Sequence, residues 1–382
     1  MINFDYASHT PADERVIAEF CRVERDFPGN ALATHNAGRA AAAEMARATS
    51  GVANLLGVKP HEIIFTSGAS EANNLAIKGI AKAYRHVGKH ILSTCLEHPS
   101  VSGTLAALQL SGYETELLRI LPNGKIDIEH LQTAIRKDTV LICVSAVDSE
   151  LGAIQPVAQI LELLAAHPHC HLHVDAAQAV GKIPVKLSGP STFCISPHKF
   201  HGLGGVGVLV KREGIVLEPL IHGGSGTTIY RSGTPVVSLA ASTYTALEIA
   251  LGEMDCRLET VRKLREYTIE ALRRTGINTR INSPCDGSPY ILNLSVPGIK
   301  GMDFQAQLDK RGICVSVKSA CSADNAPSRA VMAISRDKKI AQCSWRISFD
   351  HNQLVGKTDQ LVFAFEEICN SALSHSPQSG GV

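Results

Sequence analysis

The chain lacks both an excess of charge and a long apolar run, and each absence excludes a class of protein. Its 37 basic and 36 acidic residues leave a formal net charge of +1. Without an overall basic field, we expect no direct binding of nucleic acid. No apolar run reaches the roughly 18 residues that a membrane-spanning helix needs, so we expect no membrane association. Residues 1–5 show no basic stretch leading into an apolar one, which predicts that there is no signal peptide.

Paired cysteines and internal repeats are also missing. The eleven cysteines, an odd number, include no CxxC pair, which favours reduced thiols in a cytoplasmic protein over a disulfide framework. What the chain does have is 382 residues, 45% of them hydrophobic and 19% charged, which is typical of an ordinary folded protein. This length is too great for one small core, so we expect two packed units.

The order of expected strands and helices predicts an α/β fold. Up to about residue 250, short β-rich runs alternate with helical stretches; the runs are residues 62–66, 90–94, 140–147, 171–174, 193–195 and 206–210. Such alternation favours a mostly parallel sheet with helices on both faces. After that point, long helices and two expected strands, near 290–296 and 345–349, indicate a smaller α+β unit. We predict a large domain of residues 12–255 and a small domain of residues 1–11 and 256–382.

Three segments of the first part carry groups that could bind a ligand or take part in catalysis. Thr66–Glu71 follows an expected strand and opens a helix, where free N–H groups suit an anion, although a plain turn capped by serine is the commoner explanation. Asp175 stands at a strand end, where it could keep a pyridinium nitrogen protonated or simply cap a turn. Lys199 follows 24 residues later beside His198 and a glycine-rich stretch. An amine there could form a Schiff base, whereas most lysines are solvated surface charges.

Several stretches together indicate a family. They are residues 5–11, 66–74, 97–101, 173–178, 196–199, 231–235 and 319–322. In this order they resemble the class V aminotransferase-like enzymes of fold type I, and specifically the cysteine desulfurases. The resemblance covers roughly residues 1 to 350, and several motifs in register are stronger evidence than any one of them. It implies a fold type I transferase whose cofactor is pyridoxal 5'-phosphate.

The resemblance also implies roles in holding the cofactor. Lys199 would carry it as a Schiff base, Asp175 would pair with its pyridine nitrogen, and His98 would stack on the ring and take part in proton transfer. Gln178 would contact the phenolic oxygen of the ring. The phosphate would be held by Ala69, Ser70, Ser196 and His198. Thr234 would reach the phosphate of a neighbouring subunit, which implies a homodimer.

For the reaction, the resemblance implies a substrate site and a sulfur acceptor. Arg346 would bind the substrate carboxylate through its planar fork of donors. Cys321 would take sulfur from L-cysteine, leaving L-alanine and a persulfide that a sulfur-accepting protein then receives. A free thiol has a pKa of about 8.5, so its surroundings must activate it, and Lys318 could help. The alternatives are a selenocysteine lyase, another class V lyase or aminotransferase, or a weakened sulfur-relay scaffold.

The chain departs from the family's pattern in four places, one of which is Asp5-Tyr6 where Asp-Asn is common. Asp148-Ser149-Glu150 stands where Asn-Asn-Glu is usual. Ser149 would therefore replace an amide that contacts the cofactor's phenolic oxygen and the substrate, which leaves alignment and rate open. Lys318 replaces a glycine, and residues 347–352 lack the usual glycine and threonines. These changes indicate a specialised branch.

Histidines crowd one further segment, residues 167–173, and could suggest a metal site. In a strand, however, His173 shares a face with Asp175, and in the family this face meets the cofactor. We therefore expect no metal.

Overall fold

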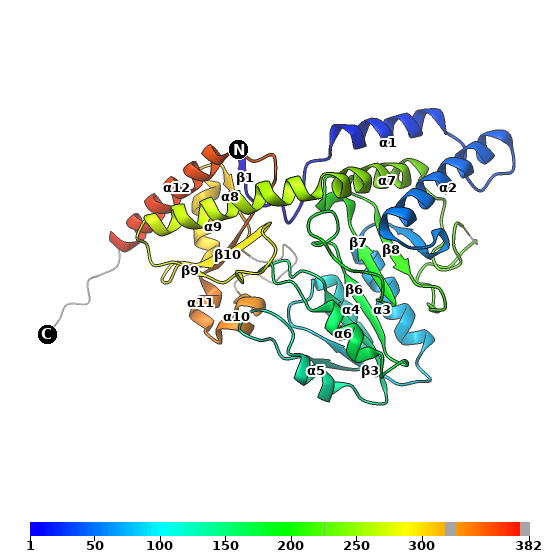
Figure 1. The fold of residues 1–382 in the computed structure, drawn as a ribbon, viewed down its shortest axis with the longest axis horizontal. Helices are drawn as coiled ribbons and strands as arrows, with labels where there is room; N and C mark the ends of the chain where they lie inside the picture. The colour runs from blue at the N-terminus through cyan, green and yellow to red at the C-terminus, as the bar shows by residue number, and fades with distance from the viewer. Residues whose placement is uncertain (225, 318–325, 375–382) are drawn as a thin grey trace.

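The computed structural model describes residues 1–224, 226–317 and 326–374. Its largest element is a seven-stranded sheet (Figure 1). In spatial order the strands are β2 (Ile63–Thr66), β8 (Gly207–Lys211), β7 (Thr192–Ile195), β6 (His171–Asp175), β5 (Thr139–Ser145), β3 (His90–Ser93) and β4 (Glu114–Leu117). All neighbouring pairs are parallel except those that β8 makes with β2 and β7. The predicted α/β architecture is confirmed.

Helices accompany this sheet. They are α1 (Glu14–Asp26), α2 (Asn36–Leu56), α3 (Ala69–Ala83), α4 (Pro99–Gln109), α5 (Ile128–Ala134), α6 (Val157–Leu164) and α7 (Val237–Gly252). The central strands β5 and β6 are buried along their whole length, as expected for parallel strands that are covered on both faces. The edge strand β4 was not predicted from the sequence, because its polar residues are largely exposed and give no apolar run.

The rest of the chain forms a smaller sheet with its own helices. β10 (Ile291–Ser295) pairs antiparallel with β12 (Ser344–Ser348) and with β9 (Arg280–Ile281). The helices are α8 (Met254–Arg274), α9 (Gly301–Asp309), α10 (Arg329–Ser335), α11 (Lys338–Gln342) and α12 (Val355–Ser374). Figure 1 shows α7 and α8 following one another almost in line. The predicted boundary near residue 255 falls at their junction, and the division into two domains stays a prediction.

The N-terminal segment runs from the small sheet to the large one. β1 (Ile2–Asn3) pairs in parallel with β11 (Ile313–Cys314), and Ser348 N–H donates to the Phe4 carbonyl. A few residues on, Thr10 N–H donates to the carbonyl of His198 at 3.0 Å. Residues 2–10 therefore connect the C-terminal sheet with the loop that carries Lys199. Within the described residues, no helix combines the length and apolar character needed to cross a membrane.

Candidate active site

A cavity of about 420 Å³ brings most of the predicted site residues together. It lies where β5, β6 and β7 end and where α3 begins. Its lining includes Ala69, Ser70, His98, Ser149, Asp175, Gln178, Ser196, His198, Lys199 and Arg346. Ends of parallel strands are the usual ligand sites of such sheets. The predicted cluster is thus assembled from segments far apart in the sequence.

The start of α3 forms the anion-binding side of the cavity. Gly68 caps the helix, so the N–H groups of its first turn, beginning at Ala69, have no partner within the helix. The neighbouring strand β8 approaches closely, since a Cβ on Gly207 would lie 2.4 Å from the carbonyl carbon of Gly68. Arg231 and Glu71, paired at 3.0 Å, connect residues 231–235 to this helix. The geometry suits a phosphate or a similar anion.

Asp175 is held by a buried chain of hydrogen bonds. Its carboxylate accepts from Asn73 Nδ2 at 2.8 Å and from the N–H of Ala177 at 3.0 Å. The side-chain oxygen of Asn73 in turn accepts from Nε2 of His173 at 2.8 Å. Burial lowers the pKa of His173 to about 4, so this histidine is neutral at pH 7. The resemblance assigned no role to Asn73, although it lies within the matching stretch 66–74.

His98 is the N-cap residue of α4, and its imidazole is neutral. Its Nδ1 accepts from the backbone N–H of Ser100 at 3.1 Å, which leaves the ring proton on Nε2. Burial, more than the positive charge of Lys199, lowers its pKa despite the opposing effect of Asp175. A neutral ring with one N–H can accept or donate a proton near pH 7.

Lys199 ends a short 3-10 turn, Pro197–Lys199, and its amine lies between two backbone carbonyls. Nζ donates to the oxygen of Ala7 at 2.8 Å and to that of Ser8 at 2.6 Å. Ser196 and His198 contact each other at 3.0 Å through Oγ and Nδ1. Burial and the nearby Lys199 lower the pKa of His198 to about 4. The N-terminal segment therefore fixes the position of the reactive amine.

Arg346 lies on β12 and is almost completely buried. Its guanidinium donates to Asp5 at 2.6 Å, to Ser8 Oγ at 2.9 Å and to the carbonyl of Ser149 at 2.7 Å. Among the described residues, its Nε has no hydrogen-bond partner. That nitrogen is itself buried, and Asp5 competes for one of the terminal donors of the fork.

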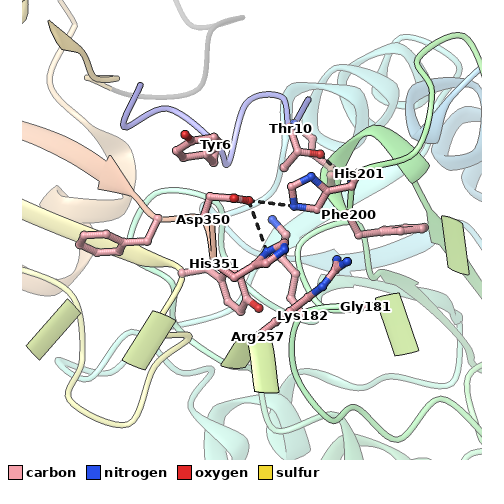
Figure 2. A pocket seen from close by; sticks show the side chains of 12 residues that line it. Tyr6, Thr10, Gly181, Lys182, Phe200, His201, Arg257, Asp350 and His351 are labelled. Carbon is pink, nitrogen blue, oxygen red and sulfur yellow. Dashed lines mark hydrogen bonds and ion pairs between the residues drawn. The ribbon is translucent and has the colours of Figure 1, made fainter. Parts of the chain in front are cut away.

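Residues 347–352, the unusual stretch after Arg346, contact the loop that carries Lys199. Asp350 lies 2.8 Å from Nε2 of His201 and 3.7 Å from Nδ1 of His351. Figure 2 shows these three side chains together, with Lys182 and Arg257 beside them. Because His201 follows Lys199 by two residues, the residues that replace the family's usual glycine and threonines connect β12 to the Lys199 loop.

The structure does not place two predicted residues in this cavity, for different reasons. Thr234 lines a separate cavity of about 100 Å³, together with Ser67 and Gly205. Cys321 lies outside the described residues, as does Lys318. Three other cysteines, Cys21, Cys256 and Cys285, are exposed.

Glu97 is a buried acid beside the cavity that the sequence reasoning missed. It accepts from Thr94 Oγ1 at 2.8 Å and from Ser145 Oγ at 2.7 Å. Burial, with a smaller effect from the charge of Asp175, raises its pKa from 4.5 to about 7. Its position directly before His98, in the matching stretch 97–101, was the available signal.

Glu97→Gln is expected to remove a pH-dependent loss of stability. An acid whose pKa is raised in the folded state contributes to the free energy of unfolding. This contribution is complete below the unfolded pKa and is lost as pH rises through the folded pKa. Between pH 5 and pH 8, wild type should therefore lose on the order of 2 kcal/mol of unfolding free energy relative to the variant. Thermal unfolding of cofactor-free protein across this range measures the effect. Glu129→Gln, at an exposed position, is the control; parallel pH curves for wild type and Glu97→Gln would contradict the assignment.

Comparison with known proteins identifies the family. The aminotransferase class-V profile matches residues 2–361. Cysteine desulfurase IscS of Dictyoglomus turgidum is 36% identical, over 91% of this chain and 89% of its own length. A solved structure described as a NifS-like protein superposes with a TM-score of 0.91 at 32% identity, covering 97% of this chain and 99% of its own. Another, SspA in complex with cysteine, has a TM-score of 0.81 at 29% identity, covering 93% and 100%. The chain belongs to the pyridoxal-phosphate-dependent aminotransferase class-V family, in its cysteine desulfurase branch.

Proposed function

We propose that this enzyme uses bound pyridoxal phosphate to remove sulfur from L-cysteine. The products are L-alanine and a persulfide on Cys321, from which a sulfur-accepting protein takes the sulfur. The observation that supports this most is the convergence of an amine, a carboxylate and a helix N-terminus on one cavity, namely Lys199, Asp175 and the start of α3.

The groups present fit the proposed cofactor. A volume of about 420 Å³ is within the usual range of cofactor sites, roughly 300–1,000 Å³. The start of α3 with Ser70, Ser196 and His198 suits the phosphate, and Asp175 suits a protonated ring nitrogen. Lys199 suits the aldehyde carbon. When bound, the cofactor supplies an electron-withdrawing ring that weakens bonds at the α-carbon of the substrate.

Side chains of the cavity then hold or transfer protons and orient the substrate. The negative charge of Asp175, kept in place by Asn73, favours a proton on the ring nitrogen. His98, which carries its proton on Nε2, is placed to exchange a proton on one face of the cavity. Arg346 binds the substrate carboxylate through its terminal nitrogens, and Asp5 is the competitor.

The sulfur step uses the thiolate of Cys321. The thiolate attacks the substrate sulfur, the bond from Cβ to sulfur breaks, and a sulfur–sulfur bond forms on the enzyme. The carbon fragment gains a proton and leaves as alanine. Thr234 lies outside the cavity of its own chain, which agrees with a role in a neighbouring subunit's site. We therefore include a homodimer in the proposal, which light scattering of the cofactor-loaded protein would test.

Product analysis tests the function directly. Purified enzyme is expected to convert L-cysteine to L-alanine, with one sulfur recovered as persulfide or sulfide for each alanine formed. A preference for selenocysteine with little turnover of cysteine would favour the lyase alternative. An absence of turnover by a cofactor-loaded protein would favour a sulfur-relay scaffold. A keto acid product would indicate an aminotransferase.

A further inference from the structure

Lys182 is a buried lysine that the proposed chemistry does not yet use. It lies four residues after Gln178 and is 4% exposed. Its Nζ donates to Oε1 of Gln178 at 2.8 Å and lies 5.7 Å from the ring centroid of Tyr290. No carboxylate among the described residues forms an ion pair with it. Figure 2 shows its side chain beside the group formed by His201, Asp350 and His351.

The burial of this amine carries a cost in stability. Burial, and then the charges of Lys199 and Arg346, lower the pKa of Lys182 to about 7, against a weaker opposing effect of Asp350. Because this base takes up a proton more easily when unfolded, the unfolding free energy falls as pH drops from about 10 towards 7. A residue that only filled space here would be more stabilising without its charge, so packing alone does not account for Lys182.

The hydrogen bonds of Gln178 show what Lys182 does. The carbonyl of Ala7 can only accept, so the amide nitrogen of Gln178 faces Ala7 and the amide oxygen faces the N–H donor of Lys182. The amide nitrogen then lies on the other side, where Nε2 donates to the carbonyl of Ala7 at 2.8 Å. The same carbonyl accepts from Lys199. One N–H of the Gln178 amide is left for a ligand in the cavity that this residue lines.

We propose that Lys182 is a positioning residue that fixes the orientation of the Gln178 amide, so that one of its N–H groups faces the phenolic oxygen of the cofactor. This inference rests on the proposed function. A donor at that oxygen takes up part of its negative charge, so the oxygen stabilises a proton on the Lys199 nitrogen less strongly. Below its pKa of about 7, the charged form of Lys182 acts in the same direction, because it disfavours a proton on the nitrogen of Lys199. Both effects lower the pH at which the Lys199 nitrogen loses its proton.

Other ionisable groups surround this network and must be the same in every protein compared. They are Lys199, His201, Arg257, Arg346, Asp350 and His351. None of them changes in the variants below. Arg257 is paired with Glu253 at 2.7 Å, so most of its charge is compensated.

Lys182→Met is the main test, because methionine is also unbranched, is shorter by one atom only, and removes the donor and the charge. We expect the pH midpoint of the bound cofactor's colour change to rise by about one unit. The cofactor dissociation constant should rise about tenfold, the usual cost of one hydrogen bond to a charged group. The melting temperature of the cofactor-free variant should equal or exceed that of wild type at pH 7.

A matched control and a rescue variant make the test specific. Lys211→Met also removes a buried lysine with a hydrogen bond, from Nζ to the carbonyl of Ile215 at 2.8 Å. It lies at the end of β8 away from the cavity and should leave the midpoint unchanged. Lys182→Arg retains a donor and a charge, and the adjoining cavity of about 10 Å³ provides some room for it. Its midpoint should remain near that of wild type.

The outcomes separate this inference from the proposed function. An unchanged midpoint in Lys182→Met, or a lower melting temperature with unchanged cofactor properties, would overturn the positioning role. If Lys182→Met does not fold, a shift in Lys182→Arg as large as one unit would overturn it instead. A wild-type protein that binds no cofactor at Lys199 would refute the proposed function itself.

Discussion

Replacing Cys321 with serine should abolish alanine formation, by about a thousandfold or more, and leave the protein yellow. A hydroxyl is a far poorer nucleophile toward sulfur than a thiolate, so the step that breaks the bond from Cβ to sulfur has no acceptor. The described residues that line the cavity already supply groups for the phosphate, the ring nitrogen and the aldehyde carbon, so cofactor binding should be unaffected. Quantifying alanine after incubation with cysteine measures the first effect, and the visible absorption band measures the second.

The exposed cysteines provide the control for this experiment. Cys256 lies on α8 and is exposed, so Cys256→Ser should keep full activity. Mass spectrometry after brief exposure to cysteine should find a persulfide on Cys321 of wild type and none on Cys256 or Cys285. Near-normal alanine production by Cys321→Ser would refute the desulfurase mechanism. It would support a lyase, in which sulfur or selenium leaves without attack by an enzyme thiol.

Replacing Lys199 with alanine should eliminate the covalent attachment of the cofactor and all turnover. Among the described lining residues, Lys199 carries the amine that can bond to an aldehyde carbon, and the carbonyls of Ala7 and Ser8 fix its position. Borohydride treatment followed by mass spectrometry should find the cofactor on the peptide with Lys199 in wild type. The same treatment should find no modified peptide in the variant.

Lys186→Ala is the matched control, since this exposed lysine lies 13 residues earlier and has no part in the cavity. It should retain both colour and activity. A reducible covalent link that persists in Lys199→Ala would show that another amine carries the cofactor. Lys182 would then be the first residue to test, because it lies on the same hydrogen-bonded network.

The strands could be predicted from the sequence where burial produces continuous apolar runs. β5 and β6 are such cases, and the predicted and observed bounds differ by two residues at most at either end. β4 could not be predicted, because an exposed edge strand of polar residues lacks that signal. The two-residue strands β1 and β11 pair across almost the whole chain, and no local pattern encodes such a contact.

The cavity residues were predictable from motifs, and their supporting groups were not. Asp175 and Lys199 stand in recognisable segments, whereas the roles of Asn73, Glu97 and Lys182 depend on which side chains burial places beside them. The partner of Arg346 shows the same limit. Its contact with Asp5 joins residues 341 positions apart, so only the fold reveals that the substrate's carboxylate must compete with it.

The path of the N-terminal segment has a consequence for synthesis on the ribosome. Residues 2–10 emerge before the residues of the large sheet, yet Ala7 N–H donates to Ser348 Oγ, 341 positions later in the chain. Domains fold as they emerge, N-terminal parts first, at about 5–20 residues per second. The large sheet can therefore form early. The segment whose Ala7 and Ser8 carbonyls orient Lys199 gains its contact with Ser348 only after the last part of the chain has been made. The catalytic pocket is therefore completed late in synthesis. In a nascent chain it stays incomplete until the region around Ser348 has left the ribosome.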